Sequence, residues 1–342
     1  MSLLEVENLT VSFNTPDGIV QAVRDVSFTL DAGKTLGIVG ESGSGKSVTS
    51  QTIMGLTRGA TISGRAVFED QYLFELEPEQ LQEIRGARIA MIFQDPLSSL
   101  HPYYRVGWQI VEMLRAHDRA ISKKAAKLRA VELLALVGIP QPARRVDDFP
   151  HQFSGGMRQR AMIAMAIALN PRLLIADEPT TALDVTVQAQ VLDVLKRIQQ
   201  EFGTAIIMIT HDLGVIADLA DDVVVMYAGA TMEKSGQNDM FYAHHHPYTE
   251  GLLESLPSYG DERERLRPIK GQPPSLINLP AGCPYHPRCP YVMDVCRTDD
   301  PPLRAVPGDG PHVSACWLPT DRAARVAARV ELASRTLAGR TP

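Results

Sequence analysis

The stretch from Gly40 to Ser47 constrains the fold of this chain more than any other part of its sequence. It reads GESGSGKS, follows the apolar run Leu36 to Val39 and precedes residues that favour a helix. The spacing GxxxxGK[ST] between a strand and a helix is that of a phosphate-binding loop. Glycines let successive backbone N–H groups converge on phosphate oxygens, and the helix start adds positive potential. We therefore expect a strand, a phosphate-binding loop and a helix in this order.

The last two residues of the loop carry most of its chemistry. Lys46 is placed to reach the β- and γ-phosphates of a nucleoside triphosphate, and the hydroxyl of Ser47 to ligate Mg²⁺. An ordinary Gly/Ser turn before a helix does not account for a lysine and a serine at the two positions that this chemistry needs. The predicted phosphate-binding residues are Gly40, Ser42, Gly43, Gly45, Lys46 and Ser47.

Several further apolar runs predict the sheet around the loop. Strands that are apolar throughout and alternate with helical patterns are typical of a parallel sheet covered on both faces. Near-alternation of apolar and polar residues at the start of the chain instead predicts an antiparallel β layer. The buried strands are expected at 173–177, 205–210 and 223–229, the antiparallel layer at 3–13 and 26–30, and helices within 97–150.

Two carboxylates end one of these strands. Asp177 and Glu178 follow the run LLIA, which places them at the carboxyl edge of the sheet, where ligands bind in open α/β folds. On its own such a pair is weak evidence, because carboxylates also end strands as solvated termini. In a chain with a phosphate-binding loop, we expect Asp177 to hold Mg²⁺ through its water shell and Glu178 to orient or deprotonate the attacking water.

A Ser-Gly-Gly sequence before a long apolar helix identifies the family. Residues 153–160 read FSGGMRQR. This segment resembles the LSGGQ signature of ATP-binding cassette (ABC) ATPases, and it stands between the phosphate-binding loop and the acidic strand, as in that family. The resemblance implies that Ser154, Gly155 and Gly156 complete the ATP site of a second subunit, so that hydrolysis needs a dimer closed over two ATP molecules.

Other positions are carried over from the ABC family one at a time. Gln94 in MIFQDP matches the glutamine that contacts Mg²⁺ and water, and His211 in IMITHD matches the histidine that contacts the γ-phosphate. Asp184 in TTALD matches the loop that crosses the dimer interface. Phe13 is the candidate for stacking on adenine, although an aromatic residue on a first strand is at least as often a core residue.

The subfamily is indicated by two longer stretches. FQDPLSSLHP resembles FQDPMTSLNP of the dipeptide, oligopeptide and nickel importer ATPases, with His101 in place of the usual Asn, and residues 154–190 resemble that subfamily almost letter for letter. HPYT at 246–249 resembles the motif that opens its C-terminal extension. The resemblance covers about residues 1–318. It implies an ABC ATPase domain at 1–256, with a helical subdomain at about 97–170, and a C-terminal extension at 257–342 that ends in a helix.

This resemblance implies an ATPase that powers uptake of di- or oligopeptides, with nickel, glutathione or another small solute as the alternative cargo. The implied partners are a second ABC ATPase subunit, two membrane permease subunits and an extracytoplasmic substrate-binding protein. Residues about 94–110 are expected to pass movements to the permeases. A location on the cytoplasmic face of the cell membrane follows, and the start of the chain has no features of a secretory signal.

Charge argues against a nucleic-acid function. The net charge is −6, and the sequence contains no block of basic residues with which to hold a polyanion. A soluble ABC ATPase that acts on DNA or ribosomes generally has tandem cassettes, a long coiled-coil insertion or basic arms, and this sequence has none of them. We therefore expect no nucleic-acid partner.

Four cysteines and three adjacent histidines are the candidate metal ligands in the sequence. Cys283, Cys289, Cys296 and Cys316 lie in a Pro-rich segment that resembles GCxFxPRCxxAxxxC of the peptide importer ATPases, some of which carry a [4Fe-4S] cluster. That cluster is the favoured interpretation, with zinc and free or disulfide-bonded cysteines as alternatives. For the histidines at 244–246 a solvent-exposed turn is favoured over a metal site.

Overall fold

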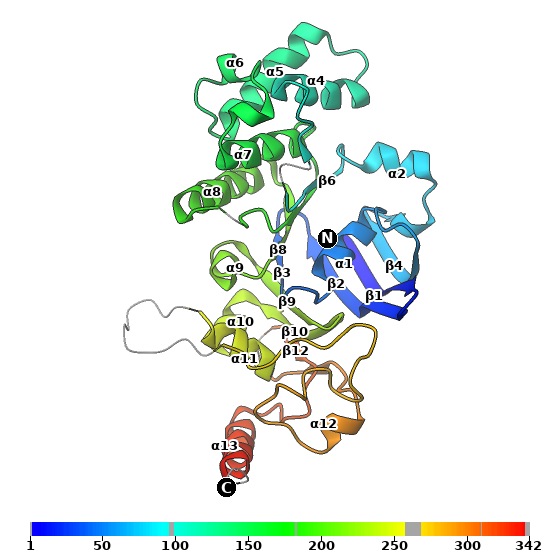
Figure 1. Ribbon diagram of the computed structural model, residues 1–342, viewed down its shortest axis with the longest axis vertical. Helices are drawn as coiled ribbons and strands as arrows, with labels where there is room; N and C mark the ends of the chain where they lie inside the picture. The colour runs from blue at the N-terminus through cyan, green and yellow to red at the C-terminus, as the bar shows by residue number, and fades with distance from the viewer. Residues whose placement is uncertain (1, 96–98, 182, 257–267, 309, 339–342) are drawn as a thin grey trace.

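The computed structural model describes residues 2–95, 99–181, 183–256, 268–308 and 310–338. A layer of helices and the C-terminal segment lie at opposite ends of the molecule, and two sheets lie between them (Figure 1). The helices in the described parts of the chain are too short or too polar to cross a lipid bilayer.

The larger sheet has a parallel core, as its apolar strands predict. Its strand order is β11-β12-β10-β9-β3-β8-β7-β6, in which the five strands from β9 to β6 run parallel and β10, β12 and β11 are antiparallel. The parallel strands are β3 (Thr35–Val39), β6 (Ile89–Ile92), β7 (Leu173–Asp177), β8 (Ala205–Thr210) and β9 (Asp222–Tyr227), and the others are β10 (Ala230–Gly236), β11 (Arg304–Ala305) and β12 (Val313–Ser314).

The smaller sheet is antiparallel and packs on one face of the larger one. Side chains of β7 alternate between two cores: Leu173 and Ile175 pack with the antiparallel strands, whereas Leu174 and Ala176 pack with the helices on the other face. This sheet has the order β2-β1-β4-β5, with β1 (Ser2–Thr15), β2 (Gly18–Asp31), β4 (Ala60–Phe68) and β5 (Gln71–Tyr72).

Helices cover the remaining surfaces. Val191, Leu195 and Ile198 on α8 face the core that contains Leu174 and Ala176. The helices near the sheets are α1 (Lys46–Ile53), α2 (Pro78–Ile84), α8 (Val185–Phe202), α9 (Leu213–Leu219), α10 (Gln237–Tyr242) and α11 (Pro247–Glu254), together with a 3₁₀ turn at Leu73–Glu75. The helical layer contains α4 (Val106–His117), α5 (Lys123–Leu136), α6 (Pro142–Arg145), a 3₁₀ turn at Pro150–Gln152 and α7 (Gly155–Ala166).

The C-terminal segment is mostly loop, but it is attached to the larger sheet. Its strands β11 and β12 pair beside β10, and it also contains α12 (Val295–Thr298) and the terminal helix α13 (Arg322–Ala338), which confirms the helix expected there. The predicted domain boundary near 257 falls where the described residues stop, so both it and the predicted limits of the helical subdomain stay predictions.

Candidate nucleotide-binding site

The phosphate-binding loop connects β3 to α1, as the sequence predicts, and two of its glycines have no room for a side chain. A Cβ atom on Gly40 would lie 2.1 Å from the backbone oxygen of Met226, and one on Gly45 would lie 2.4 Å from that of Ala22. Gly45 also has a φ of 100°, which side-chain-bearing residues rarely adopt. The tight packing against the neighbouring strands therefore fixes the path of the loop, while Ser42 and Gly43 at its tip are exposed.

Lys46 lies inside this loop. Its Nζ donates hydrogen bonds to the backbone oxygens of Gly40 at 2.7 Å and Glu41 at 2.9 Å. Burial lowers the pKa of Lys46, which has only 4% of its surface exposed. The ammonium group is thus held at the centre of the loop, where it can exchange these neutral carbonyl partners for phosphate oxygens.

Ser47 and Asp177 meet next to the lysine. The Ser47 hydroxyl donates to Oδ1 of Asp177 at 3.0 Å, across a sequence separation of 130 residues. Burial raises the pKa of Asp177, and the neighbouring Glu178 adds to this effect. A hydroxyl and a carboxylate are oxygen ligands of the kind that Mg²⁺ prefers, so the pair fits the predicted magnesium site.

Glu178 is the centre of a cluster of polar side chains at the same sheet edge. Its Oε2 accepts hydrogen bonds from Nε2 of Gln94 at 3.0 Å and from the hydroxyl of Thr181 at 2.8 Å, and Nδ1 of His211 lies 3.5 Å from Oε1. Gln94 and His211 are exposed, whereas Glu178 is half-buried. The three residues predicted to be catalytic are therefore brought together, because β6, β7 and β8 end side by side.

The Ser-Gly-Gly segment lies elsewhere, at the start of α7 in the helical layer (Figure 1). The Ser154 side chain accepts from the backbone N–H of Met157 at 3.3 Å and caps the helix, and both Ser154 and Gly155 are exposed. A Cβ on Gly156 would lie 2.5 Å from Val187 on α8, so this glycine lets the two helices pack closely. The exposed Ser154 and Gly155 leave this helix start accessible to another subunit.

Two other predicted residues have clear local roles in the structure. Asp184 is exposed and caps α8, since its carboxylate accepts from the N–H of Val187 at 2.9 Å. Phe13 is half-buried on β1, opposite Val20 of β2, and packs against the core shared with the antiparallel sheet. Its predicted contact with adenine stays a prediction.

The residues at this edge fit ATP and a magnesium ion. The loop offers a glycine backbone close to two neighbouring strands, a buried ammonium group and a helix start, and the pair of Ser47 and Asp177 offers oxygen ligands. Glu178 supplies a carboxylate beside these groups. Together with the antiparallel sheet and the exposed Ser-Gly-Gly helix start, this arrangement defines an ABC ATPase.

Comparisons with known proteins agree with the class of ABC ATPases and indicate a family within it. Residues 23–181 match the family model "ABC transporter", and residues 232–296 match "Oligopeptide/dipeptide transporter, C-terminal region". The chain is 52% identical over 321 residues to the oligopeptide transport ATP-binding protein OppD of Salmonella typhimurium, covering 93% of this chain and 94% of that protein. It is 51% identical to the dipeptide transport ATP-binding protein DppD of Bacillus subtilis, covering 94% and 96%. The chain belongs to this family of peptide transport ATP-binding proteins.

A solved structure shows the same architecture. It is described as a dimeric post-hydrolysis state of an ATP-binding cassette bound to ADP and phosphate. The two chains are 27% identical, with a TM-score of 0.63, and the match covers 68% of this chain and 98% of that one. The match leaves 32% of this chain uncovered (100 − 68), so this chain is longer than the solved cassette.

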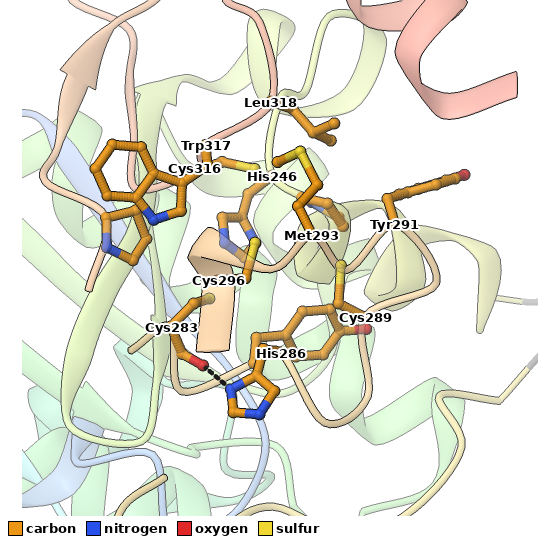
Figure 2. A pocket seen from close by; sticks show the side chains of 13 residues that line it. His246, Cys283, His286, Cys289, Tyr291, Met293, Cys296, Cys316, Trp317 and Leu318 are labelled. Atoms are coloured by element: carbon orange, nitrogen blue, oxygen red, sulfur yellow. Dashed lines mark hydrogen bonds between the residues drawn. The ribbon is translucent and has the colours of Figure 1, made fainter. Parts of the chain in front are cut away.

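The predicted iron-sulfur cluster is wrong. Within the described residues, which include all four cysteines, no group of three or more His, Cys, Asp or Glu side chains is placed to hold a metal ion. The cysteines are free thiols around one pocket, with Met293, Trp317 and Leu318 also in its lining (Figure 2). Burial raises the pKa of Cys283 to about 12 and also raises those of Cys289 and Cys316, which favours neutral thiols over metal-binding thiolates.

The prediction of a solvent-exposed turn at 244–246 is also wrong. His245 and His246 are 3% and 1% exposed, and the backbone N–H groups of both donate to the carboxylate of Glu233 on β10. Nδ1 of His246 accepts from the N–H of Tyr248 at 3.0 Å and caps α11. Glu233 is buried in the sheet and needs hydrogen-bond donors. The backbone N–H groups of His245 and His246 supply them, which draws this part of the chain into the interior.

Three residues near the site were not predicted from the sequence. Thr181 contacts Glu178, Tyr248 contacts the phosphate-binding loop, and Arg288 contacts the same loop from the C-terminal segment. Tyr248 lies in HPYT and Arg288 in the segment with the cysteines. Both stretches resemble the peptide importer ATPases, but this resemblance does not predict which residues Tyr248 and Arg288 contact.

Proposed function

We propose that this chain is the ATP-hydrolysing subunit of an importer for di- or oligopeptides and acts on the cytoplasmic face of the cell membrane. The relatives are named for oligopeptide and dipeptide transport, and they are similar along nearly the whole chain. These names favour peptides over nickel, glutathione or another small solute as the cargo. They also favour a transporter over an ABC ATPase that acts on nucleic acid.

The hydrolytic role rests on one observation above all: the carboxylate of Glu178 is held by Gln94, Thr181 and His211 beside the magnesium-binding pair. A carboxylate in this position can orient a water molecule and accept its proton as the water attacks the γ-phosphate. Lys46 holds the β- and γ-phosphates, and His211 donates toward the γ-phosphate. Ser47 and Asp177 would hold Mg²⁺, which would supply positive charge beside the phosphates. Most of the rate enhancement is then expected from positioning and charge stabilisation.

The ATP site is completed by a second ABC ATPase subunit. Ser154 and Gly155 are exposed at the start of α7, away from the phosphate-binding loop of their own chain, which supports their action on ATP held by the partner. The start of a 12-residue helix offers N–H donors and a positive dipole to the γ-phosphate. Closure over two ATP molecules and reopening after hydrolysis then drive the transport cycle.

A groove in the helical layer is our candidate for contact with a membrane permease subunit. It has a volume of about 690 Å³ and is lined mainly by residues of α4 and α5, Trp108 among them. An aromatic row leads to it: Tyr104 stacks on Trp108 at 4.3 Å between ring centroids, and Tyr103 is 83% exposed. This row and Gln94 both lie within residues 94–110, the stretch expected to pass movements between the permeases and the catalytic cluster. Two permeases and an extracytoplasmic substrate-binding protein complete the proposed importer.

The test of this function is the substitution Glu178→Gln, which removes the base and changes little else. We expect ATP turnover to fall by about 100-fold or more, because proton transfer by a positioned side chain contributes on that order. ATP binding, measured by equilibrium titration, should be retained. Glu201→Gln, at an exposed position on α8, is the matched control and should keep full turnover.

The two measurements separate the possible outcomes. Normal turnover in Glu178→Gln shows that another group activates water. Loss of ATP binding in the same variant shows that the substitution damages the site rather than the chemistry.

A further inference from the structure

The C-terminal segment reaches back to the phosphate-binding loop through one buried side chain. Arg288, whose side chain is 4% exposed, donates from Nη1 and Nη2 to the two carboxylate oxygens of Glu41, at 2.5 and 3.0 Å. Glu41 is the second residue of the loop, directly after Gly40. A two-armed contact between an arginine and a carboxylate fixes orientation as well as distance, so the segment and the loop are held in one geometry.

The other donors of Arg288 are also used. Nη1 contacts the hydroxyl of Tyr227 at 3.2 Å, Nε donates to the backbone oxygen of Lys270 at 3.0 Å, and Nη2 lies 3.4 Å from the backbone oxygens of Ile269 and Gly271. A guanidinium group has five N–H donors in a rigid plane, and this environment engages all of them. A lysine cannot reproduce such an arrangement, because its ammonium group is a point donor on a flexible stem.

The backbone of Glu41 is held as well. Its N–H donates to the hydroxyl of Tyr248 at 2.9 Å, and its carbonyl oxygen accepts from Nζ of Lys46 at 2.9 Å. Tyr248 is fully buried, and its ring packs against Tyr227 at 4.7 Å between centroids. The residue that follows Gly40 is thus fixed at its side chain, its N–H and its carbonyl, and the carbonyl contact is with the lysine that binds phosphate.

The charge of Glu41 explains why it needs a partner. A carboxylate in the phosphate-binding loop repels the negatively charged phosphates over a short distance in a partly buried site. The guanidinium of Arg288 cancels this charge and is itself fixed by its backbone partners. Without Arg288, the loop would carry an unpaired negative charge close enough to act on Lys46, the lysine expected to bind phosphate.

We propose that Arg288 is a positioning residue for nucleotide binding: it neutralises Glu41 and fixes the phosphate-binding loop, so the C-terminal segment forms part of the nucleotide-binding machinery. This inference rests on the proposed function, since it takes ATP as the ligand of the loop. It assigns to the C-terminal segment a task that does not depend on its cysteines.

The test is a pair of substitutions measured by titration of the full chain with a fluorescent ATP analogue. Arg288→Met should raise the Kd by about tenfold or more, because removing one member of a buried, hydrogen-bonded charge pair leaves the other uncompensated. Adding Glu41→Gln to Arg288→Met removes the unpaired charge and should bring the Kd back to within about threefold of the unaltered chain. Arg297→Ala, at an exposed arginine of the same segment, serves as the control and should leave the Kd unchanged.

A second variant tests the backbone contact with minimal disturbance. Tyr248→Phe removes only the hydroxyl that accepts from the N–H of Glu41 and should weaken ATP binding several-fold. Because this variant keeps the buried ring, it gives an answer even if Arg288→Met does not fold, as monitored by circular dichroism.

The measured Kd values for ATP either support or overturn the proposed role of Arg288. An unchanged Kd in Arg288→Met, or in Tyr248→Phe where Arg288→Met does not fold, overturns the proposal. A loss of affinity that Glu41→Gln does not rescue shows that Arg288 only supports the fold of the segment, which also overturns it. Failure of the unaltered chain to bind ATP is a different result, because it refutes the proposed function itself.

Discussion

The nucleotide-binding edge and the C-terminal segment hold their key residues by different means. At the sheet edge, Asp177 ends β7, His211 follows β8 directly, and Lys46 begins α1 after the loop that follows β3, so local chain direction brings them together. The C-terminal segment is mostly loop. The short strand β12 pairs with β10, and two buried side-chain pairs strengthen this attachment: Arg288 with Glu41, and His312 with Glu233. The first region therefore depends mainly on backbone geometry, whereas the second also depends on a few buried polar pairs.

The largest expected difference between the two regions is in ATP turnover. Ser154→Arg places a bulky charge at the exposed start of α7, where the proposed second subunit would approach, and should lower turnover of the ATPase pair by about 100-fold, as loss of a phosphate-stabilising group does. ATP binding by the isolated chain should be unaffected. Arg297→Ala in the C-terminal segment is the matched surface change and should retain turnover.

Equal turnover in Ser154→Arg and Arg297→Ala shows that the start of α7 takes no part in catalysis.

A smaller difference is expected in coupling to the membrane subunits. Tyr103 and Tyr242 are 83% and 81% exposed, but Tyr103 lies in the aromatic row of the helical layer, whereas Tyr242 ends α10. Tyr103→Ala should reduce peptide uptake by the reconstituted importer roughly tenfold, because exposed aromatic residues often dominate protein interfaces. Turnover by the separate ATPase subunits should be retained.

Tyr242→Ala is the control and should transport normally. If Tyr242→Ala loses uptake and Tyr103→Ala does not, the permease contact lies near the end of α10 and not at the proposed groove.

The smallest effect concerns stability and pH at the attachment of the C-terminal segment. Burial lowers the pKa of His245 and of His246 to about 4, and Arg325 adds to the effect on both, while Glu233 opposes it. The pKa of Glu233 is itself lowered: burial raises it, but the hydrogen bonds from His312 and from the His246 backbone outweigh burial. The folded chain thus keeps both histidines neutral, whereas the unfolded chain protonates them below about pH 6.5.

The free energy of unfolding should therefore be at its full value above pH 6.5 and decrease as the pH falls from 6.5 toward 4. Each histidine contributes at most about 1.4 kcal/mol per pH unit in this window. His245→Gln keeps an N–H donor but cannot titrate. The free energy of unfolding, measured with denaturant at several pH values, should therefore depend less steeply on pH between 4 and 6.5 in this variant. The exposed His151→Gln is the control. A slope that is the same in His245→Gln and in the unaltered chain contradicts the buried, neutral state of His245.

The difference between the two regions also explains how far the sequence could be read. Apolar runs predicted β3, β7, β8 and β9, and the motifs at their ends placed Lys46 and Glu178 at one edge. These predictions succeed because a strand that is apolar throughout must be covered on both faces, and parallel strands end on the same side.

The C-terminal segment and the residues that attach it to the sheet could not be predicted in this way. The burial of His245 depends on Glu233, a charged residue in a strand whose burial its own sequence does not indicate. Likewise, Arg288 and Glu41 are 247 residues apart, and nothing local to either residue predicts their contact. The four cysteines suggested a metal centre because thiolates are metal ligands. Whether their side chains come together depends on how the loops pack, which the sequence does not show.

The central claim is that two subunits enclose ATP between the phosphate-binding loop of one and the Ser-Gly-Gly helix start of the other. It is tested most directly by counting the ATP molecules retained by the Glu178→Gln ATPase pair after rapid removal of free nucleotide. We predict two unhydrolysed ATP molecules per pair and a stable association of the subunits that depends on ATP. Retention of ATP by separate, unpaired subunits would contradict the account.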